Sequence, residues 1–150
     1  MNLKPITDFR GEYRWLSNYH ECRIVHEGIF YPSTEHAYQA AKTLDLAKRR
    51  EIAGLSTPGK AKRAGNALTD KRPDWDDVKV QVMREVLIYK FVTNRDLEKK
   101  LMETKGRQLI EGNTWGDKFW GVCDGEGQNW LGRLLMEIRD GEMGEFNEFN

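Results

Sequence analysis

A long segment in the middle of the chain, residues 74–93, constrains the fold more than any other part of the sequence. Apolar side chains occupy most of its helical circumference: Val78, Val82, Met83, Val86, Leu87, Tyr89 and Phe91. A helix that is apolar nearly all round is buried inside a protein rather than laid on its surface. We therefore predict one central, buried helix that runs to about Thr93.

The flanking segments predict further helices and only a small β element. Residues 22–31 resemble two short strands around a His-Glu-Gly turn. Helices are expected to begin after capping residues. They are predicted over about 34–54, from Pro58 onward, over about 97–105 and over about 130–140, with caps at Ser33 or Thr34, Thr57, Asp96 and Asn129. The alternation of strands and helices that builds an α/β sheet is missing from the sequence. The predicted fold class is mainly α with a small β element near the N-terminus, at the border of α+β.

The length of the chain predicts one compact domain. It has 150 residues, which supports a single domain over 1–150. A short acidic tail is expected at about 142–150. No apolar run approaches the roughly 18 residues of a membrane helix, and the N-terminus lacks a signal-peptide pattern. Two isolated thiols, Cys22 and Cys123, fit a reducing compartment, so a cytoplasmic location without membrane contact is predicted.

Charge is balanced in total but not along the chain. There are 24 basic and 24 acidic side chains, so we do not expect this protein to coat nucleic acid in general, because such binding depends on an excess of basic groups that neutralise phosphates. Residues 42–72 nevertheless hold nine basic and three acidic side chains, and residues 111–150 hold nine acidic and three basic. Such a basic segment can offer a local face to an anion. Solvated helix faces explain the same charges without any ligand, and charge alone favours that simpler interpretation.

The histidines do not predict a metal site. His20, His26 and His36 all lie in the first quarter of the chain. Their spacing differs from that of familiar zinc sites, which use about four ligands at short intervals. We predict ordinary core or surface histidines and no metal.

The helix that begins near Ser33 carries the most informative polar residues. At 100° per residue, Ala37, Ala40, Ala41 and Leu44 fall on one side, and Glu35, Tyr38, Gln39 and Lys42 fall on the other. The simple interpretation is an alanine face packed inward and a polar face in water. In the second interpretation the polar face is the floor of a cleft, where a carboxylate meets a lysine. A lysine shielded from water binds its proton less tightly and becomes a usable nucleophile.

Residues 109–122 combine aromatic and acidic side chains in a segment with no regular pattern. They include two tryptophans, one phenylalanine and two acids. Loops of this kind often form ligand sites, because tryptophan stacks on flat rings and a carboxylate stabilises a sugar cation or orients water. A loop whose tryptophans fill the core is the alternative. Residues 125–133 and 9–19 give weaker signals, which a capped helix start and a turn with a surface arginine explain equally well.

Taken together, four blocks resemble the NADAR family. They are Gly-Glu-Tyr-Arg-Trp-Leu-Ser-Asn-Tyr, Ser-Thr-Glu-His-Ala-Tyr-Gln-Ala-Ala-Lys, Ile-Glu-Gly-Asn…Trp-Gly, and Asp-Gly-x-Gly-x-Asn-x-Leu-Gly-x-x-Leu-Met-x-x-Arg. They follow the family's order over residues 9–139. The sequence departs from the family pattern at Tyr19-His20-Glu21, where Phe-Tyr-Pro is expected.

The resemblance implies an N-glycosidase with a mainly helical fold and no metal or redox cofactor. The family includes bacterial N-glycosidases that act on riboflavin-pathway intermediates, and other members remove ADP-ribose from guanine in nucleic acid. The implied substrate is therefore an ADP-ribose-like or ribose-phosphate compound, with ADP-ribosylated nucleic acid as a further partner. A module that binds NAD or ADP-ribose without cleaving it is the alternative. A structural protein with a polar helix face is the weakest reading.

The resemblance also implies roles for individual residues. The implied catalytic residues are Glu35, Lys42, Glu111 and Asp117. The implied substrate-binding residues are Arg14, Ser17, Asn18, Gln39, Trp120 and Asn129. The sequence does not rank Glu35 against Glu111 as the carboxylate that stabilises the sugar cation.

Overall fold

The computed structural model describes residues 3–141 and divides the chain into two compact units. One is the α1–α4 unit, residues 14–94. The other is the terminal unit, whose described residues are 3–13 and 95–141. The expected acidic tail lies outside the described residues. Each unit is considered below by itself.

The α1–α4 unit begins with the end of the 3-10 helix η1 (Gly11–Leu16) and a β-hairpin. Strands β1 (Glu21–His26) and β2 (Ile29–Ser33) pair antiparallel. Glu27 and Gly28 form the turn with φ of 48° and 81°. Two consecutive residues with positive φ are what a two-residue hairpin turn needs to match the twist of its strands. The predicted pair of strands is confirmed.

Two helices replace the single helix expected over 34–54. They are α1 (Thr34–Ala40) and α2 (Leu46–Ala53). Thr43 interrupts the helical ladder, because its carbonyl accepts from Arg49 Nε at 2.8 Å and its hydroxyl donates to Asp70 at 2.8 Å. Asp45 then caps a new helix by accepting from the backbone N–H groups of residues 47 and 48. The expectation of one continuous helix is wrong at this point, and Lys42 lies in a turn just beyond α1.

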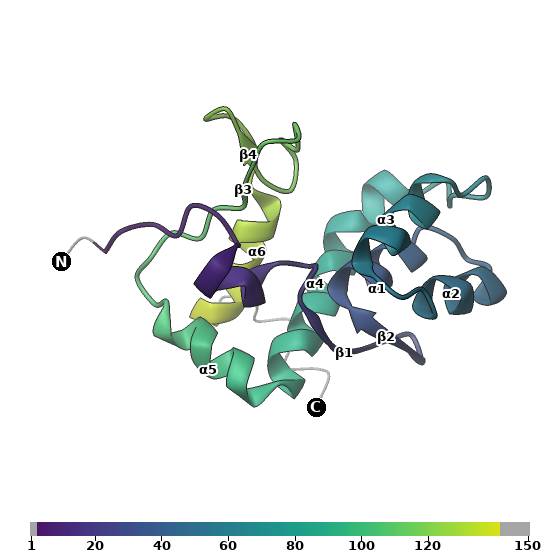
Figure 1. Cartoon of the computed structure of the whole chain (residues 1–150), viewed down its shortest axis with the longest axis horizontal. Helices are drawn as coiled ribbons and strands as arrows, with labels where there is room; N and C mark the ends of the chain where they lie inside the picture. The colour runs from purple at the N-terminus through teal and green to yellow at the C-terminus, as the bar shows by residue number, and fades with distance from the viewer. Residues whose placement is uncertain (1–2, 142–150) are drawn as a thin grey trace. The chain divides into compact units, whose positions relative to one another are not determined.

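Helices α3 (Pro58–Asn66) and α4 (Trp75–Thr93) complete the unit. Thr57 caps α3 as predicted, with its hydroxyl accepting from the N–H of Lys60. Helix α4 is the predicted central helix, and it buries Trp75, Val82, Met83, Val86, Leu87, Lys90 and Phe91. Figure 1 shows α4 as the longest helix, with α1 packed between it and the neighbouring α2 and α3.

Helix α1 is the most enclosed element of the α1–α4 unit. It contacts α2, α3, α4 and both strands, and all seven of its residues are buried. The simple interpretation of a polar face in water is therefore wrong. Leu44, expected on the inward alanine face, is 63% exposed because the chain leaves the helix before reaching it.

His36 fastens α1 to the segment that follows α2. Its Nε2 lies 2.9 Å from the carbonyl of Leu55 and its Nδ1 lies 2.6 Å from Ser33 Oγ. The carbonyl can only accept, so Nε2 carries a proton and, in the neutral ring, Nδ1 accepts from the Ser33 hydroxyl. Burial lowers the pKa of His36, although the hydrogen bond to Leu55 and the charge of Glu21 oppose the shift.

Acid should therefore destabilise the protein through His36. A folded-state pKa below the unfolded value of about 6.5 means that the unfolded chain binds the proton first as pH falls. The free energy of unfolding should fall below about pH 6.5, by at most about 1.4 kcal/mol per pH unit for this one proton. Urea denaturation between pH 8 and 5 measures it, with His36→Gln as the non-titrating reference. An identical pH dependence in both proteins would contradict the assignment.

The terminal unit combines two helices with a short parallel bridge. Its elements are α5 (Arg95–Glu103), β3 (Gly112–Asn113), β4 (Val122–Cys123) and α6 (Trp130–Asp140). Strands β3 and β4 pair in parallel, within a segment that the sequence predicted as irregular. Residue Asp96 lies inside the first turn of α5 rather than at its cap. Helix α6 ends as predicted, with Gly141 left-handed at φ 69°.

The terminal unit also ties residues 4–13 to the segment after α5. Ile6 bridges Leu109, with backbone hydrogen bonds to residues 108 and 110. Arg107 donates to the carbonyl of Lys4 at 2.7 Å and to the hydroxyl of Tyr13 at 2.9 Å. The prediction of a mainly helical chain with a small β element near the N-terminus is confirmed.

Candidate active site

The predicted site residues fall into two sets, one in each unit. The α1–α4 unit holds Arg14, Ser17, Asn18, Glu35, Gln39 and Lys42. The terminal unit holds Glu111, Asp117, Trp120 and Asn129. Within each unit the structure places several of these residues in direct contact.

Glu35 is a buried carboxylate held in a defined orientation. Its side chain is 7% exposed, and its Oε1 accepts from Gln39 Nε2 at 2.8 Å. Its backbone N–H donates to the carbonyl of Asn18 at 3.1 Å. Because Glu35 lies in the first turn of α1, the helix dipole favours its ionised form.

Gln39 contacts Glu35 and the facing helix α3. It is 3% exposed, and its Oε1 has no hydrogen-bond partner among residues 3–141. The amide packs on Gly65, where an added Cβ would overlap its atoms. Glycine at 65 therefore lets α3 approach α1, and Gln39 is placed to orient Glu35.

Lys42 lies in the turn that follows α1, with its N–H bonded to the carbonyl of Gln39 at 3.2 Å. Its ammonium group is 5.5 Å from the centre of the Tyr38 ring. Burial lowers the pKa of Lys42 from its ordinary value of 10.5, and the charges of Lys71, Lys62 and Lys79 lower it further. Glu35 acts in the opposite direction, so its carboxylate and this amine share one electrostatic environment. A lowered pKa increases the fraction of neutral, nucleophilic amine.

The segment before β1 brings further polar groups to Glu35. Ser17 Oγ accepts from the N–H of Tyr19 at 3.1 Å. Asn18 donates to the sulfur of Met83 at 3.7 Å. Burial raises the pKa of Tyr19, and the charge of Glu35 raises it further, so this phenol lies near the carboxylate. Arg14 is exposed.

Lys90 of α4 bonds the backbone of the segment that precedes β1. It is fully buried on α4, and its Nζ donates to the carbonyls of Trp15 at 2.8 Å and Ser17 at 3.2 Å. Burial lowers its pKa to about 8. Lys90 was not predicted from the sequence, where the only signal was a lysine among the apolar residues of the central helix.

In the terminal unit, Asn113 links Glu111 to Asp117. Its Nδ2 donates to Glu111 Oε2 at 3.2 Å and to the carbonyl of Asp117 at 2.8 Å. Its Oδ1 accepts from the N–H of Asp117 at 3.0 Å. An added Cβ at Gly121 would overlap Glu111, so the glycine leaves room for this carboxylate. Asn113 was not among the predicted site residues, although it belongs to the Ile-Glu-Gly-Asn block that resembles the family.

Asp117 organises the aromatic end of the same loop. One carboxylate oxygen accepts from the N–H groups of Phe119 at 3.1 Å and Trp120 at 2.9 Å. The Phe119 and Trp120 rings meet edge to face at 4.9 Å. These contacts orient Trp120, which is half-buried, while Trp115 in the same loop is 60% exposed.

Asn129 positions Glu111 and does not cap α6 with its side chain. Its backbone is left-handed, with φ of 55°. Its Oδ1 accepts from the N–H of Glu111 at 2.9 Å, and its Nδ2 donates to the carbonyl of Leu109 at 2.9 Å. Asn129 directly precedes α6 as predicted, but the expected capping by its side chain is wrong, because that side chain bonds the 109–111 segment.

This contact predicts a specific loss of stability in Asn129→Asp. The new carboxylate can still accept from the backbone N–H of Glu111. Its second oxygen replaces the Nδ2 donor, however, and therefore faces the Leu109 carbonyl without a hydrogen bond. We expect the free energy of unfolding to fall by about 1–3 kcal/mol, the cost of an unsatisfied polar group. Urea denaturation measures the change. Gln128→Glu is the matched control, since it introduces the same charge next door and keeps an acceptor for Trp130 Nε1. Equal stability of the two variants would contradict the assigned contact.

The family follows from comparison with known proteins. Residues 7–141 match the NADAR domain. The chain belongs to the NADAR family. It is 40% identical to N-glycosidase YbiA of Shigella boydii over 142 residues, which cover 93% of this chain and 86% of that protein. It is 36% identical to Riboflavin biosynthesis protein VVA0006 of Vibrio vulnificus, with 91% of this chain matching 37% of that protein.

A solved structure supports the same assignment. The NMR structure of the Escherichia coli protein YbiA superposes with a TM-score of 0.80 at 36% identity, covering 97% of this chain and 87% of that one. The resemblance inferred from sequence blocks is therefore confirmed, and the NADAR match extends over described residues of both units.

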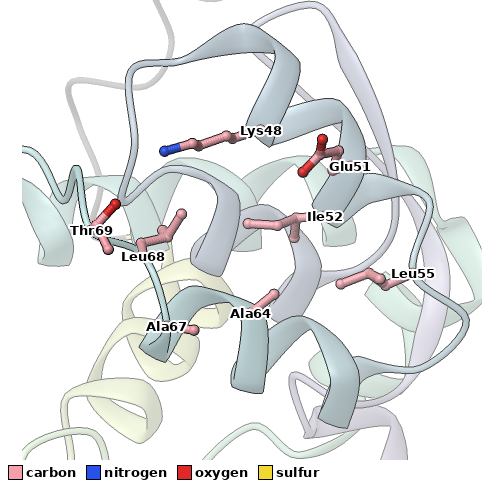
Figure 2. A pocket seen from close by; sticks show the side chains of 8 residues that line it. All are labelled: Lys48, Glu51, Ile52, Leu55, Ala64, Ala67, Leu68 and Thr69. Atoms are coloured by element: carbon pink, nitrogen blue, oxygen red, sulfur yellow. The ribbon is translucent and has the colours of Figure 1, made fainter.

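A groove lies elsewhere on the α1–α4 unit of this NADAR protein. It has a volume of about 230 Å³ between α2 and α3. Figure 2 shows Ile52, Leu55 and Leu68 along it, with Lys48 and Glu51 on the α2 side. None of the predicted catalytic or substrate-binding residues lines it.

Residues 3–141 show neither a metal-binding cluster nor a membrane-spanning helix. In that range no three histidine, cysteine or acidic side chains are grouped to hold a metal ion. None of the helices described there is long and apolar enough to cross a membrane.

Proposed function

We propose that this NADAR protein hydrolyses the bond between C1′ of a phosphorylated ribose or ADP-ribose and the nitrogen of a base. The broader prediction, a hydrolase of N-glycosyl bonds, is confirmed by relatives of matching length that are named N-glycosidases. The substrate is the proposed part: a ribosylated riboflavin-pathway intermediate, or ADP-ribose attached to guanine in nucleic acid.

One observation carries the proposal. A buried carboxylate, oriented by Gln39, shares its surroundings with a lysine whose pKa is lowered by burial and by neighbouring cations. Cleavage of an N-glycosidic bond develops positive charge at C1′ and O4′, as in other glycoside hydrolysis. A carboxylate fixed beside that charge lowers the barrier because it needs no reorganisation.

The proposed reaction has two stages. In the first, the C1′–N bond breaks with its electron pair passing to the base, which takes up a proton. The neutral amine of Lys42 bonds to C1′, and the proton that its nitrogen then loses is the one that the base takes up. The C1′–O4′ bond breaks as the nitrogen lone pair forms a Schiff base, and O4′ takes a proton from water. In the second, water adds to C1′, the C1′–Nζ bond breaks, and the free sugar and the amine are released. Glu35 is proposed to stabilise the cation in both stages.

The residues of the terminal unit have separate proposed roles. We expect Glu111 to be the second candidate carboxylate, oriented by Asn113 and Asn129. Asp117 is expected to act through the loop that it holds rather than as an acid, since one of its oxygens already accepts two N–H bonds. Trp120 is proposed to stack on the departing base.

The alternative is a module that binds ADP-ribose without cleaving it. Such a module needs an anion contact and an aromatic surface, but it has no use for a lysine with a lowered pKa. The environment of Lys42 therefore favours the enzyme.

A release assay tests the proposal. Purified protein is incubated separately with guanine-ADP-ribosylated DNA and with ribosylamino-pyrimidine phosphates, and products are identified by mass spectrometry. Release of ADP-ribose alone identifies a nucleic-acid hydrolase, and release of ribose 5-phosphate alone identifies a metabolite N-glycosidase. Binding of ADP-ribose with neither product would replace the proposal with the binding module.

A further inference from the structure

Three lysines from three different segments act on Lys42 through their charges. Lys62 lies on α3, Lys71 lies between α3 and α4, and Lys79 lies on α4. All three belong to the same unit as Lys42, and each of them lowers its pKa through its charge. We call Lys62, Lys71 and Lys79 the lysine cluster.

Helix packing places Lys62 on the side of α3 that faces α1. Gly65 of α3 packs directly on Gln39 of α1. Lys62 lies three residues before Gly65, so both share one face of the helix. Lys62 is half-buried, as expected for a residue on a packed face.

The other two lysines are positioned by contacts of their own. Trp75 of α4 meets Tyr38 of α1 with ring centres 5.2 Å apart. Lys79 lies four residues later on the same face of α4, and its side chain is 22% exposed with an ion pair to Asp76 at 3.3 Å. Lys71 precedes Arg72, whose N–H donates to the carbonyl of Lys42 at 2.7 Å.

We propose that the lysine cluster is a binding site for the 5′-phosphate of the sugar whose C1′ reacts at Lys42. The inference rests on the proposed function and adds the anion-binding residues to it. Ammonium groups brought together from separate segments repel one another, and a phosphate that accepts their hydrogen bonds offsets this cost. A 5′-phosphate belongs to the same sugar as C1′, so a phosphate site next to Lys42 is where this substrate needs one.

The arrangement suits a single phosphate better than a nucleic-acid backbone. A backbone is followed by basic side chains spread along a surface. Here Lys62 and Lys79 are half-buried, and the charges of these two lysines and of Lys71 all act on one amine, that of Lys42. The basic segment 42–72 noted in the sequence thus supplies Lys62 and Lys71, while Lys79 joins them only through folding.

The first test compares substrates with and without the phosphate. The variants are Lys62→Gln, Lys71→Gln, Lys79→Gln and the triple combination, assayed on a ribosylamino-pyrimidine 5′-phosphate and on its dephosphorylated form. We expect each lysine that contacts the phosphate to contribute about tenfold to the preference in kcat/KM for the phosphorylated substrate. Lys60→Gln is the matched control, because Lys60 is an exposed lysine on α3 that bonds Ser56 at 2.9 Å. An unchanged preference in the triple variant would overturn the proposal.

The second test does not depend on turnover. Calorimetry measures binding of ribose 5-phosphate and, separately, of an unmodified single-stranded oligonucleotide. Weaker ribose 5-phosphate binding in the triple variant supports the phosphate site even if the protein cleaves no N-glycoside, so the phosphate site and the proposed function can fail separately. Weaker oligonucleotide binding with unchanged ribose 5-phosphate binding would overturn the proposed phosphate site. Circular dichroism of each variant shows that the fold is retained.

Discussion

Lys42→Met is expected to lower kcat/KM for N-glycoside hydrolysis by about 10³-fold or more, because it removes a nucleophilic amine and keeps the length of the side chain. The release assay measures the loss, and Lys60→Met is the control for removing a lysine from the same unit. Near-normal turnover by Lys42→Met would exclude the amine from the mechanism.

The covalent route has its own direct test. Borohydride added during turnover should reduce the Schiff base and leave the sugar attached to Lys42, which peptide mass spectrometry locates. The same treatment of Lys42→Met should leave no adduct. An active enzyme that never forms an adduct would contradict the covalent stage.

The pH dependence of kcat/KM should reflect the protonation of the Lys42 amine. Burial and the nearby lysines lower the pKa of Lys42 from 10.5, so the neutral form appears at lower pH than for a free lysine. We expect kcat/KM to rise with pH through a midpoint below 10.5, since only the neutral amine attacks carbon.

Glu35→Gln is expected to lower kcat by about 10²–10⁴-fold while substrate binding remains. The amide keeps the size of the side chain and retains a carbonyl oxygen to accept from Gln39, so the fold of α1 should be preserved. What it loses is the negative charge that stabilises the sugar cation.

The control and the competing assignment are tested in the same assay. Glu51→Gln, on the exposed surface of α2, should have no effect on kcat. Glu111→Gln ranks the two carboxylates. A large loss in Glu111→Gln with an unchanged rate in Glu35→Gln would transfer the main electrostatic role to Glu111.

The sequence predicted several elements because local rules decide them. The central helix follows from apolar periodicity, the hairpin at 22–31 from a turn with positive φ, and the C-terminal end of α6 from a terminal glycine. The single helix over 34–54 failed because Thr43 bonds Asp70, which lies 27 residues away in the sequence, and because its carbonyl accepts from the side chain of Arg49.

The site residues were also predicted only as far as short-range sequence patterns reach. The spacing of Glu35 and Lys42 and the family blocks identified these residues from the sequence. Spacing did not reveal that Gln39 is buried against Gly65 or that Asn129 bonds the 109–111 segment. Those contacts join residues 18 to 26 positions apart, where helical periodicity carries no information.

The sequence by itself thus determined the family, the mainly helical class and the identity of the candidate acid and amine. These depend on residue order and on interactions within one or two helical turns. Tertiary structure alone decided that α1 is buried on every side and that the pKa of Lys42 is lowered. Burial and charge proximity depend on which segments pack together, so the environment of Lys42 exists only once α1, α3 and α4 have assembled.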